Sequence, residues 1–319
     1  MTPTQLRAFA TVVRLGSVKA AAQSLDVTEA AVSLHVGQLR KELGDQLFTR
    51  TAAGLAFTPG GLRLASRAVE LLGLQDRTVL EVREAGVGRR LLRLGAGSLF
   101  AEHAAPGLIG LFADRAEDLD VELSIHRAAD FEQLLLTRTL DATIGPRPSG
   151  GDPAIRTVHF LNYQVWALAA PNHPVLRGGN PGPHLLREQT WLLGPSAAED
   201  SGVVPGMLRH LGVPEDRQQI FQSQSAALEE AKRGRGVTLA LSFVAQPDVV
   251  AGTLVRIPGR FGAAQGAWNL SLLGGQQATP AAEEMARFVT TPRATQAMLR
   301  GRPVTHGRFK PAVHVTLWS

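Results

Sequence analysis

The sequence contains no cysteine in its 319 residues. This absence excludes disulfides, thiolate zinc sites, cysteine nucleophiles and thiol-based redox sensing. The nine histidines are scattered and do not fall at the spacing of a metal site. The HExxH, GxSxG and P-loop patterns of several enzyme classes are missing as well. We therefore expect the chain to be no enzyme and to hold no metal or cofactor.

Long hydrophobic runs are also absent. No stretch approaches the roughly 18 uninterrupted apolar residues of a membrane helix. The first thirty residues carry charges where a signal peptide needs an apolar core, namely Arg7, Arg14, Lys19, Asp26 and Glu29. We expect a cytoplasmic protein without a membrane partner. Its length and its 44% of hydrophobic residues favour two or three globular units.

The charge is unevenly distributed along the chain. Residues 1–90 contain twelve lysines and arginines against eight acidic residues, a surplus of four out of a total net charge of +5. The remaining 229 residues are therefore close to neutral. A basic end on a neutral body indicates a polyanionic partner, although a surplus of this size is also common on solvated surfaces.

Three helices are predicted at the N-terminus. Residues 4–15 have apolar side chains at helical spacing, with Thr2 as the cap and Gly16 as the stop. Ser17 is expected to cap a short helix over 18–25, and Thr28 to cap a helix over 29–43 that ends at Gly44. Two short helices joined by a tight turn form a helix-turn-helix.

A β-hairpin and a long helix are predicted next. The extended pieces 47–50 and 55–57, joined by a turn at 52–54, form a wing. From Thr58 to about Ala85, apolar residues recur at spacings of three, four and seven, and the Gly-rich segment 86–88 ends the pattern. Such a helix would be roughly 42 Å long. Because a small domain cannot cover it, we expect its apolar stripe, including Leu62, Ala65, Val69 and Leu72, to pair with a second copy.

The periodicity changes at Leu91. Short apolar strands alternate with amphipathic helices from there to about residue 289, which predicts an α/β fold with mostly parallel strands. The expected division is thus 1–58 for a winged helix-turn-helix, 59–88 for a linker helix, 89–300 for an α/β domain and 301–319 for a tail. The alternation at 312–317 leaves open whether the tail adds a strand or is a loose end.

A series of linked residues runs through the N-terminal segment, and Thr58 and Gly61 continue it. The series reads Ala20-Ala21-Ala22-x-x-Leu25-x-Val27-Thr28-x-x-Ala31-Val32-Ser33-x-His35-Val36-x-x-Leu39-x-x-Glu42-Leu43-Gly44-x-x-Leu47-Phe48-x-Arg50. It resembles the DNA-binding signature of the LysR-type transcriptional regulators. Downstream, the sequence 140–144 and the turn 171–174 resemble segments of the same family's effector domain. The resemblance implies a promoter-binding regulator with a two-lobed effector domain like that of periplasmic solute-binding proteins. It also implies a dimer through the linker helix, and commonly a tetramer.

The resemblance indicates which residues meet DNA. The third helix is expected to enter the major groove with its buried stripe turned inward, and Arg50 in the wing is expected to contact the backbone or the minor groove. The candidate DNA-binding residues are Ser17, Thr28, Glu29, Ala30, Ser33, Leu34, Gln38, Lys41 and Arg50. Glu29 stands where the family usually has glutamine, so the base preference of relatives does not transfer to this chain.

The resemblance also places an effector at strand ends and helix N-termini between two lobes. The candidate residues are Ser98, Leu99, Asp130, Phe131, Ser196 and Ser223. A serine at such a junction is more often an ordinary N-cap. Helix N-termini favour anions, which suggests an organic acid, although Asp130 would oppose one. The alternative is a solute-binding protein without a regulatory role, which would lack the N-terminal signature.

Overall fold

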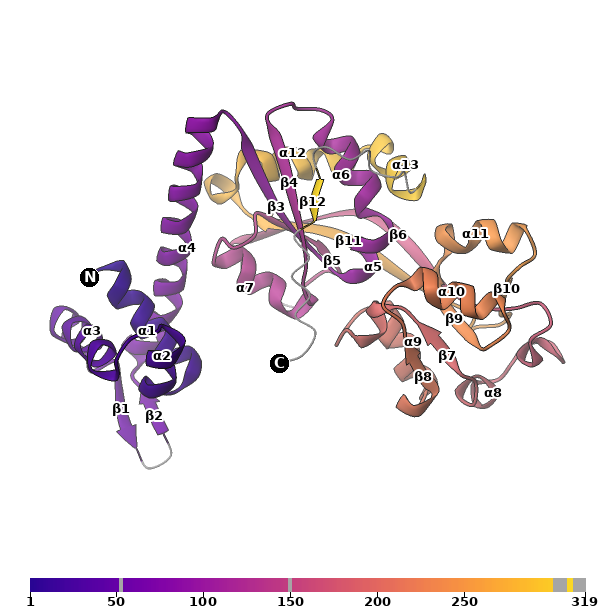
Figure 1. Ribbon diagram of the computed structural model, residues 1–319, viewed down its shortest axis with the longest axis horizontal. Helices are drawn as coiled ribbons and strands as arrows, with labels where there is room; N and C mark the ends of the chain where they lie inside the picture. Colours follow the sequence, from indigo (N-terminus) through magenta and orange to yellow (C-terminus); the bar gives the residue numbers. More distant parts are fainter. Residues whose placement is uncertain (52–53, 149–150, 301–308, 312–319) are drawn as a thin grey trace. The chain divides into compact units, whose positions relative to one another are not determined.

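A computed structural model describes residues 1–51, 54–148, 151–300 and 309–311 of the chain (Figure 1). The chain divides into two compact units. One unit comprises residues 1–87 and 136–139, and the other comprises residues 88–135 and those from 140 onward. No helix within the described residues combines the length and the apolar character needed to cross a membrane.

The first unit begins with three helices, α1 (Pro3–Leu15), α2 (Val18–Ser24) and α3 (Glu29–Leu43). The three predicted caps form: the hydroxyls of Thr2, Ser17 and Thr28 each accept a hydrogen bond from the backbone N–H three residues on. Gly16 and Gly44 end α1 and α3 in the left-handed region that favours glycine. The sequence therefore determines the boundaries of these helices locally.

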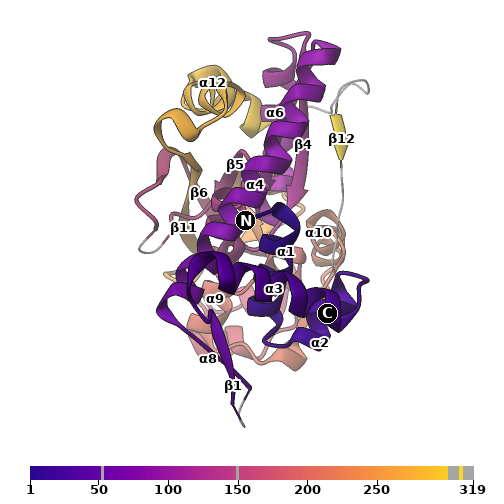
Figure 2. The same ribbon diagram turned by 90° about the vertical axis from the view of Figure 1, so that its left-hand side faces the viewer.

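The wing and the long helix complete this unit. Strands β1 (Phe48–Thr51) and β2 (Gly54–Phe57) pair in antiparallel fashion, and most of the predicted turn at 52–54 lies outside the described residues. Helix α4 runs from Pro59 to Val87 and packs against α1 (Figure 2). The core buries Phe9, Val12, Val32, Val36, Leu39 and Leu47. The apolar stripe of α3, which the sequence pattern extends to Leu43, is buried only as far as Leu39, and Leu43 is 44% exposed.

The second unit is built on one curled sheet whose strand order is β12-β4-β3-β5-β11-β6-β9-β7-β8, with β10 paired to β6. Its first lobe, called lobe I here, contains parallel strands with helices around them. These strands are β3 (Arg90–Ala96), β4 (Leu119–Ile125), β5 (Ala142–Gly145) and β12 (Phe309–Pro311). The helices are α5 (Ser98–His103), α6 (Ala105–Ala113), α7 (Phe131–Leu136), α12 (Pro280–Val289) and α13 (Pro292–Arg300). The predicted alternation at 312–317 and most of the predicted tail 301–319 lie outside the described residues.

Lobe II repeats the same kind of arrangement. Its strands are β7 (Trp191–Leu193), β8 (Gln218–Ile220), β9 (Val237–Leu241) and β10 (Val255–Arg256). The helices are α8 (Pro183–Arg187), α9 (Val203–Leu211), α10 (Gln224–Lys232) and α11 (Ser242–Val250). Strand β7 lies parallel to both β8 and β9. The parallel pairing predicted from the sequence is thus found within each lobe.

Two long strands pass between the lobes, β6 (Ile155–Ala169) and β11 (Ala263–Leu273). They pair with each other in antiparallel fashion along their length (Figure 1). The prediction of mostly parallel strands is wrong for this part of the sheet, since every antiparallel pair among the described strands of the sheet includes β6 or β11. The sequence predicted only residues 165–169 and 268–273 of these strands. Their other halves contain exposed polar residues and a glycine, which weaken the strand pattern.

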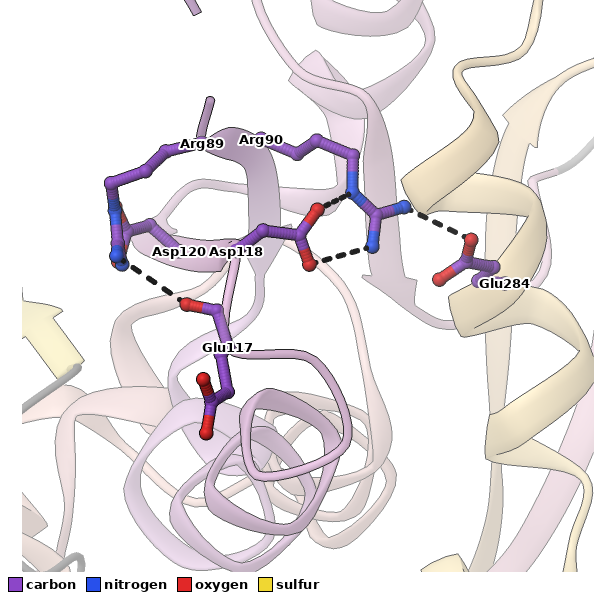
Figure 3. A network of polar contacts seen from close by, with 6 residues as sticks. All are labelled: Arg89, Arg90, Glu117, Asp118, Asp120 and Glu284. Carbon is purple, nitrogen blue, oxygen red and sulfur yellow. Dashed lines mark hydrogen bonds and ion pairs between the residues drawn. The ribbon is translucent and has the colours of Figure 1, made fainter. Parts of the chain in front are cut away.

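Ion pairs fix the first strand of lobe I where it begins (Figure 3). The Arg90 guanidinium donates from Nε to Asp118 at 2.7 Å and from Nη1 to Glu284 of α12 at 3.0 Å. Arg89 donates from Nε to Asp120 at 2.8 Å. These pairs tie the start of β3 to β4 and to α12 within the lobe. Each ion pair is partly exposed to solvent, so it orients these elements but adds little to the stability of the fold.

Candidate DNA interface and effector pocket

Helix α3 presents a solvent-facing side that matches the residues expected at DNA. Glu29, Ala30, Ser33, Leu34 and Lys41 are exposed, and Leu34 is 60% exposed although it is apolar. An exposed leucine of this kind is available to contact a thymine methyl group. Each of these residues remains a predicted contact.

A hollow of about 280 Å³ lies between α3 and the wing. It brings Ser33 of α3 and Arg50 of β1 to one surface, together with Gln46 and Thr49. Hydroxyl, amide and guanidinium groups donate hydrogen bonds, which suits contacts to phosphate oxygens or base edges. Ser33 and Arg50, two of the DNA contacts predicted from the sequence, thus line the same hollow.

Four other residues of this unit have internal roles. Ser17 and Thr28 cap α2 and α3. The amide oxygen of exposed Gln38 accepts a hydrogen bond from Gln5 at 2.8 Å. Arg40 is turned toward the wing. Its Nη2 donates to the Phe48 carbonyl at 2.7 Å and its guanidinium lies 4.6 Å from the Phe48 ring centre.

The predicted effector residue Ser98 already has a carboxylate partner. Its backbone N–H and its hydroxyl donate to the same oxygen of Glu199 from lobe II, at 2.9 and 2.5 Å. Burial raises the pKa of Glu199, although both bonds from Ser98 act in the opposite direction. Asp130 pairs with Arg127, which also reaches Asp200 at 3.2 Å. The structure therefore gathers Ser98, Asp130 and the segment 196–200 at one edge between the lobes.

The remaining predicted effector residues are engaged in the fold. Ser196 is buried in the short helix Pro195–Ala198. Ser223 accepts the backbone N–H of Ala226 and so caps α10. Phe131 is buried beneath Gly145, and Leu99 packs against the core of the second unit. These four residues cap helices or pack in the core, and their contact with an effector stays a prediction.

A larger pocket of about 720 Å³ lies beside this edge. Its walls come from the end of β5, the middle of β6 and β11, helix α9 and the loop before β11. The polar and charged residues of the lining are Arg147, His159, Tyr163, His210, Arg260, Gln265 and Asn269. No aspartate or glutamate is among the described lining residues. Two guanidinium groups without lining carboxylates make this pocket suitable for an anion.

An aromatic wall supports one side of the pocket: Tyr163 lines the pocket, and the buried rings of Trp268 and Phe100 pack in series against it. The Tyr163 ring lies 4.4 Å from the Trp268 ring, and Trp268 in turn contacts Phe100 at 5.0 Å between ring centres. Gly266 lies against Tyr163, where a β-carbon would be 2.3 Å from the ring. Burial and the nearby carboxylate of Glu199 raise the pKa of Tyr163 to about 12. The phenol is therefore a hydrogen-bond donor at neutral pH.

Sequence reasoning missed the pocket residues. Arg147 follows β5 by two positions, and the end of a strand is a signal that could have marked it. His159 and Tyr163 lie in the half of β6 that was not predicted as a strand. Arg260 stands in a loop more than a hundred residues from Arg147, and no local pattern connects them.

Two family models match the chain. Residues 3–62 match the bacterial regulatory helix-turn-helix protein of the lysR family, and residues 85–292 match the LysR substrate binding domain. The chain belongs to the LysR family of transcriptional regulators. The resemblance found in the N-terminal sequence is thereby confirmed, and so is the expected fold class of a helix-turn-helix followed by an α/β effector-binding domain. Members of this family are transcriptional regulators and not enzymes.

Relatives and solved structures agree with membership of the LysR family. An uncharacterised HTH-type transcriptional regulator of Mycobacterium tuberculosis is 55% identical over 322 residues that cover both chains completely. A RuBisCO operon transcriptional regulator of Allochromatium vinosum is 26% identical over 298 residues, which cover 91% of this chain and 96% of that one. ArgP of Mycobacterium tuberculosis is similar in structure, with a TM-score of 0.58, 18% identity and coverage of 90% and 97%. CbnR, a LysR family transcriptional regulator, gives a TM-score of 0.53 at 20% identity, with coverage of 91% and 98%.

Proposed function

We propose that this LysR-type regulator binds double-stranded promoter DNA through α3 and the wing, and that a small organic acid in the pocket beside β6 and β11 modulates this binding. The observation that carries the proposal is the pocket lining, in which Arg147 and Arg260 face a cavity of about 720 Å³ without a lining carboxylate. A cavity of this volume suits a metabolite. We infer that the protein acts in the cytoplasm, where bacterial promoters are.

The DNA contact is supported by the shared hollow of Ser33 and Arg50. Each phosphate neutralised by the protein releases counterions, so affinity should fall steeply as salt rises. A gel-shift series with the intergenic DNA next to the gene tests this. We expect Arg50→Ala to weaken binding about tenfold or more, and Ser33→Ala to weaken it less. Arg177→Ala, an exposed arginine of lobe II, is the matched control and should bind as the wild type does.

Two outcomes of the gel-shift series would contradict the proposed DNA interface. One is an Arg50→Ala protein with wild-type affinity, and the other is an affinity that hardly changes between about 50 and 200 mM salt. If the protein binds the acid but no DNA, the alternative function of a solute-binding protein without a regulatory role applies instead.

The effector pocket is tested by paired ligands and paired variants. Succinate carries two carboxylates, and succinamide is its neutral counterpart. We expect succinate and related diacids, but not succinamide, to raise the melting temperature, because a ligand that binds only the folded state stabilises it. Gly206→Leu places a side chain in the pocket, since Gly206 lines it and has nothing within 4 Å of a β-carbon. Gly110→Leu on α6 is equally unobstructed and lies outside the pocket lining. Only the first variant should lose binding.

We also propose that the protein is a dimer through α4, and that two dimers join into a tetramer through the effector domains. The helix exposes Leu62, Leu71, Leu74 and Val79 to solvent, with Leu62 56% exposed. Ala65 and Leu72, which the sequence placed on the dimer stripe, pack against the core of the first unit. Exposed apolar side chains at several positions along one helix support a symmetric contact with a second copy.

A further inference from the structure

Two glutamates form reciprocal bridges between the lobes of the second unit. Glu199 of lobe II accepts the backbone N–H and the hydroxyl of Ser98, the first residue of α5. Glu102 of α5 accepts the backbone N–H of Gln224, the first residue of α10, at 2.8 Å. Each lobe therefore supplies a carboxylate to a backbone donor of the other lobe.

Neither bridging carboxylate is neutralised by a lysine or arginine among the described residues. The nearest cation candidate for Glu102 is His103, at 3.9 Å. Burial lowers the pKa of His103 to about 4, so this imidazole is uncharged at neutral pH. Burial likewise raises the pKa of both glutamates, which means that burial disfavours their charged forms. A partly buried carboxylate without a counterion is a candidate functional group.

Glu199 is not a lining residue of the effector pocket, but unlike Glu102 it lies close to residues that are. The electrostatic effect of its carboxylate reaches Tyr163, a lining residue. Gly202 and Val203, which follow Glu199 closely in the chain, also line the pocket. An acid bound against the Tyr163 wall would therefore feel the negative charge of Glu199, and like charges at partial burial repel each other appreciably.

We propose that Glu199 is an internal competitor of the acidic effector: an anion in the pocket and the Glu199 carboxylate on Ser98 exclude each other. This inference rests on the proposed function. Uptake of the effector displaces Glu199 and breaks the bridge to Ser98, while the bridge between Glu102 and Gln224 stays in place. The lobes then remain joined through Glu102 and Gln224 and are free to separate at Glu199 and Ser98. Glu199 thereby sets both the affinity for acids and the change in lobe arrangement that follows binding.

Titration calorimetry on the full-length chain tests this with 1,2-ethanedisulfonate as the probe, because both of its charges persist across the accessible pH range. Glu199→Gln keeps the size of the side chain and removes its charge. We expect this variant to bind the disulfonate about tenfold more tightly than the wild type. Glu102→Gln removes an equivalent bridging charge away from the pocket and should change the affinity by less than about twofold. The affinity for succinamide, which carries no charge, should be the same for both variants as for the wild type.

The competition is overturned if Glu199→Gln binds the disulfonate no more tightly than the wild type does. It is also overturned if Glu102→Gln tightens binding equally, since loosening of the lobes would then explain the gain. In both cases the wild type still binds the anion, and the proposed function stands. If neither the wild type nor Glu199→Gln binds any anion, the acidic class of the effector is wrong, and the inference is lost with it.

The displacement itself has a second measurement. The chain has no cysteine, so spin labels attach only at introduced sites such as Arg115→Cys in lobe I and Val250→Cys in lobe II, both exposed. We expect disulfonate binding to change the distance distribution between the labels in the wild-type background. An unchanged distribution at saturating probe overturns the release of the lobes.

Discussion

Gly61→Ala is expected to disrupt the junction between the wing and α4. Gly61 is the third residue of α4 and its backbone N–H donates to the Thr58 hydroxyl at 2.9 Å. A β-carbon there would lie 2.0 Å from the carbonyl oxygen of Leu47, whereas real contacts of this kind stay above 3.0 Å. That carbonyl also accepts the Thr58 backbone N–H at 3.0 Å. The obstacle is therefore backbone that is already hydrogen-bonded.

The cost of relieving this contact follows from its geometry. Leu47 is buried and has a φ of 60°, a left-handed conformation that leaves little room for adjustment. Forcing a methyl group into such a place costs about 2 kcal/mol. For a unit of this size, that loss lowers the melting temperature by roughly 8–16 °C. Because β1 begins at Phe48, movement of Leu47 also shifts the strand that carries Arg50.

Differential scanning calorimetry and fluorescence anisotropy with promoter DNA measure the two effects. Gly37→Ala is the matched control, since Gly37 lies inside α3 with nothing within 4 Å of a β-carbon. It should raise stability by about 0.5–1 kcal/mol, because alanine is the better helix former. If Gly61→Ala melts at the wild-type temperature and binds DNA equally well, the reasoning from the close approach is refuted.

Three further predictions concern other parts of the chain. Hydrogen bonds from Thr58 and the Leu47 N–H lower the pKa of Asp45, so its carboxylate stabilises the fold above its unfolded pKa of about 3.9, and the benefit is lost as pH falls through the folded value. Asp45→Asn should therefore lower the melting temperature at pH 7 more than at pH 3; an equal loss at both would contradict this. Leu62→Asp with Leu74→Asp should give a monomer of 34.0 kDa by light scattering, and a wild type that is itself monomeric would remove the dimer. Ser98→Trp should abolish the response to effector in a promoter-reporter assay while operator binding survives, unless the serine is only a structural cap.

The local signals in the sequence predicted the first unit well. Thr2, Ser17 and Thr28 are caps in the structure, and Gly16 and Gly44 end the helices as expected. Each of these features depends on residues only a few positions apart. Composition and spacing therefore carry enough information to locate them.

Features that depend on distant residues could not be predicted in this way. Helix α11 contains Pro247, which normally argues against a helix, and α9 begins with a Val-Val-Pro-Gly sequence that has no clear helical pattern. The hydrogen bonds between the lobes and the pocket walls join residues that are far apart in the chain, such as Ser98 and Glu199, which are 101 positions apart. Nothing at Ser98 in the sequence indicates that its donors already have an internal acceptor. The sequence therefore marked an edge between the lobes, and the contact of the residues chosen there with an effector stays a prediction.

The closely packed, tilted rings of Tyr163 and Trp268 have a thermodynamic consequence for ligand binding. Packing against Phe100 and the close approach to Gly266 restrict the rotation of these rings before any ligand arrives. These side chains are therefore already ordered in the folded protein, so ligand binding does not bear the entropy cost of ordering them. A ligand that covers the wall should then bind with a favourable enthalpy and a negative heat-capacity change at room temperature. In the proposed pocket, Gly266 would thus influence effector affinity through the space that its missing side chain leaves for Tyr163, in addition to any contact that it makes as a lining residue.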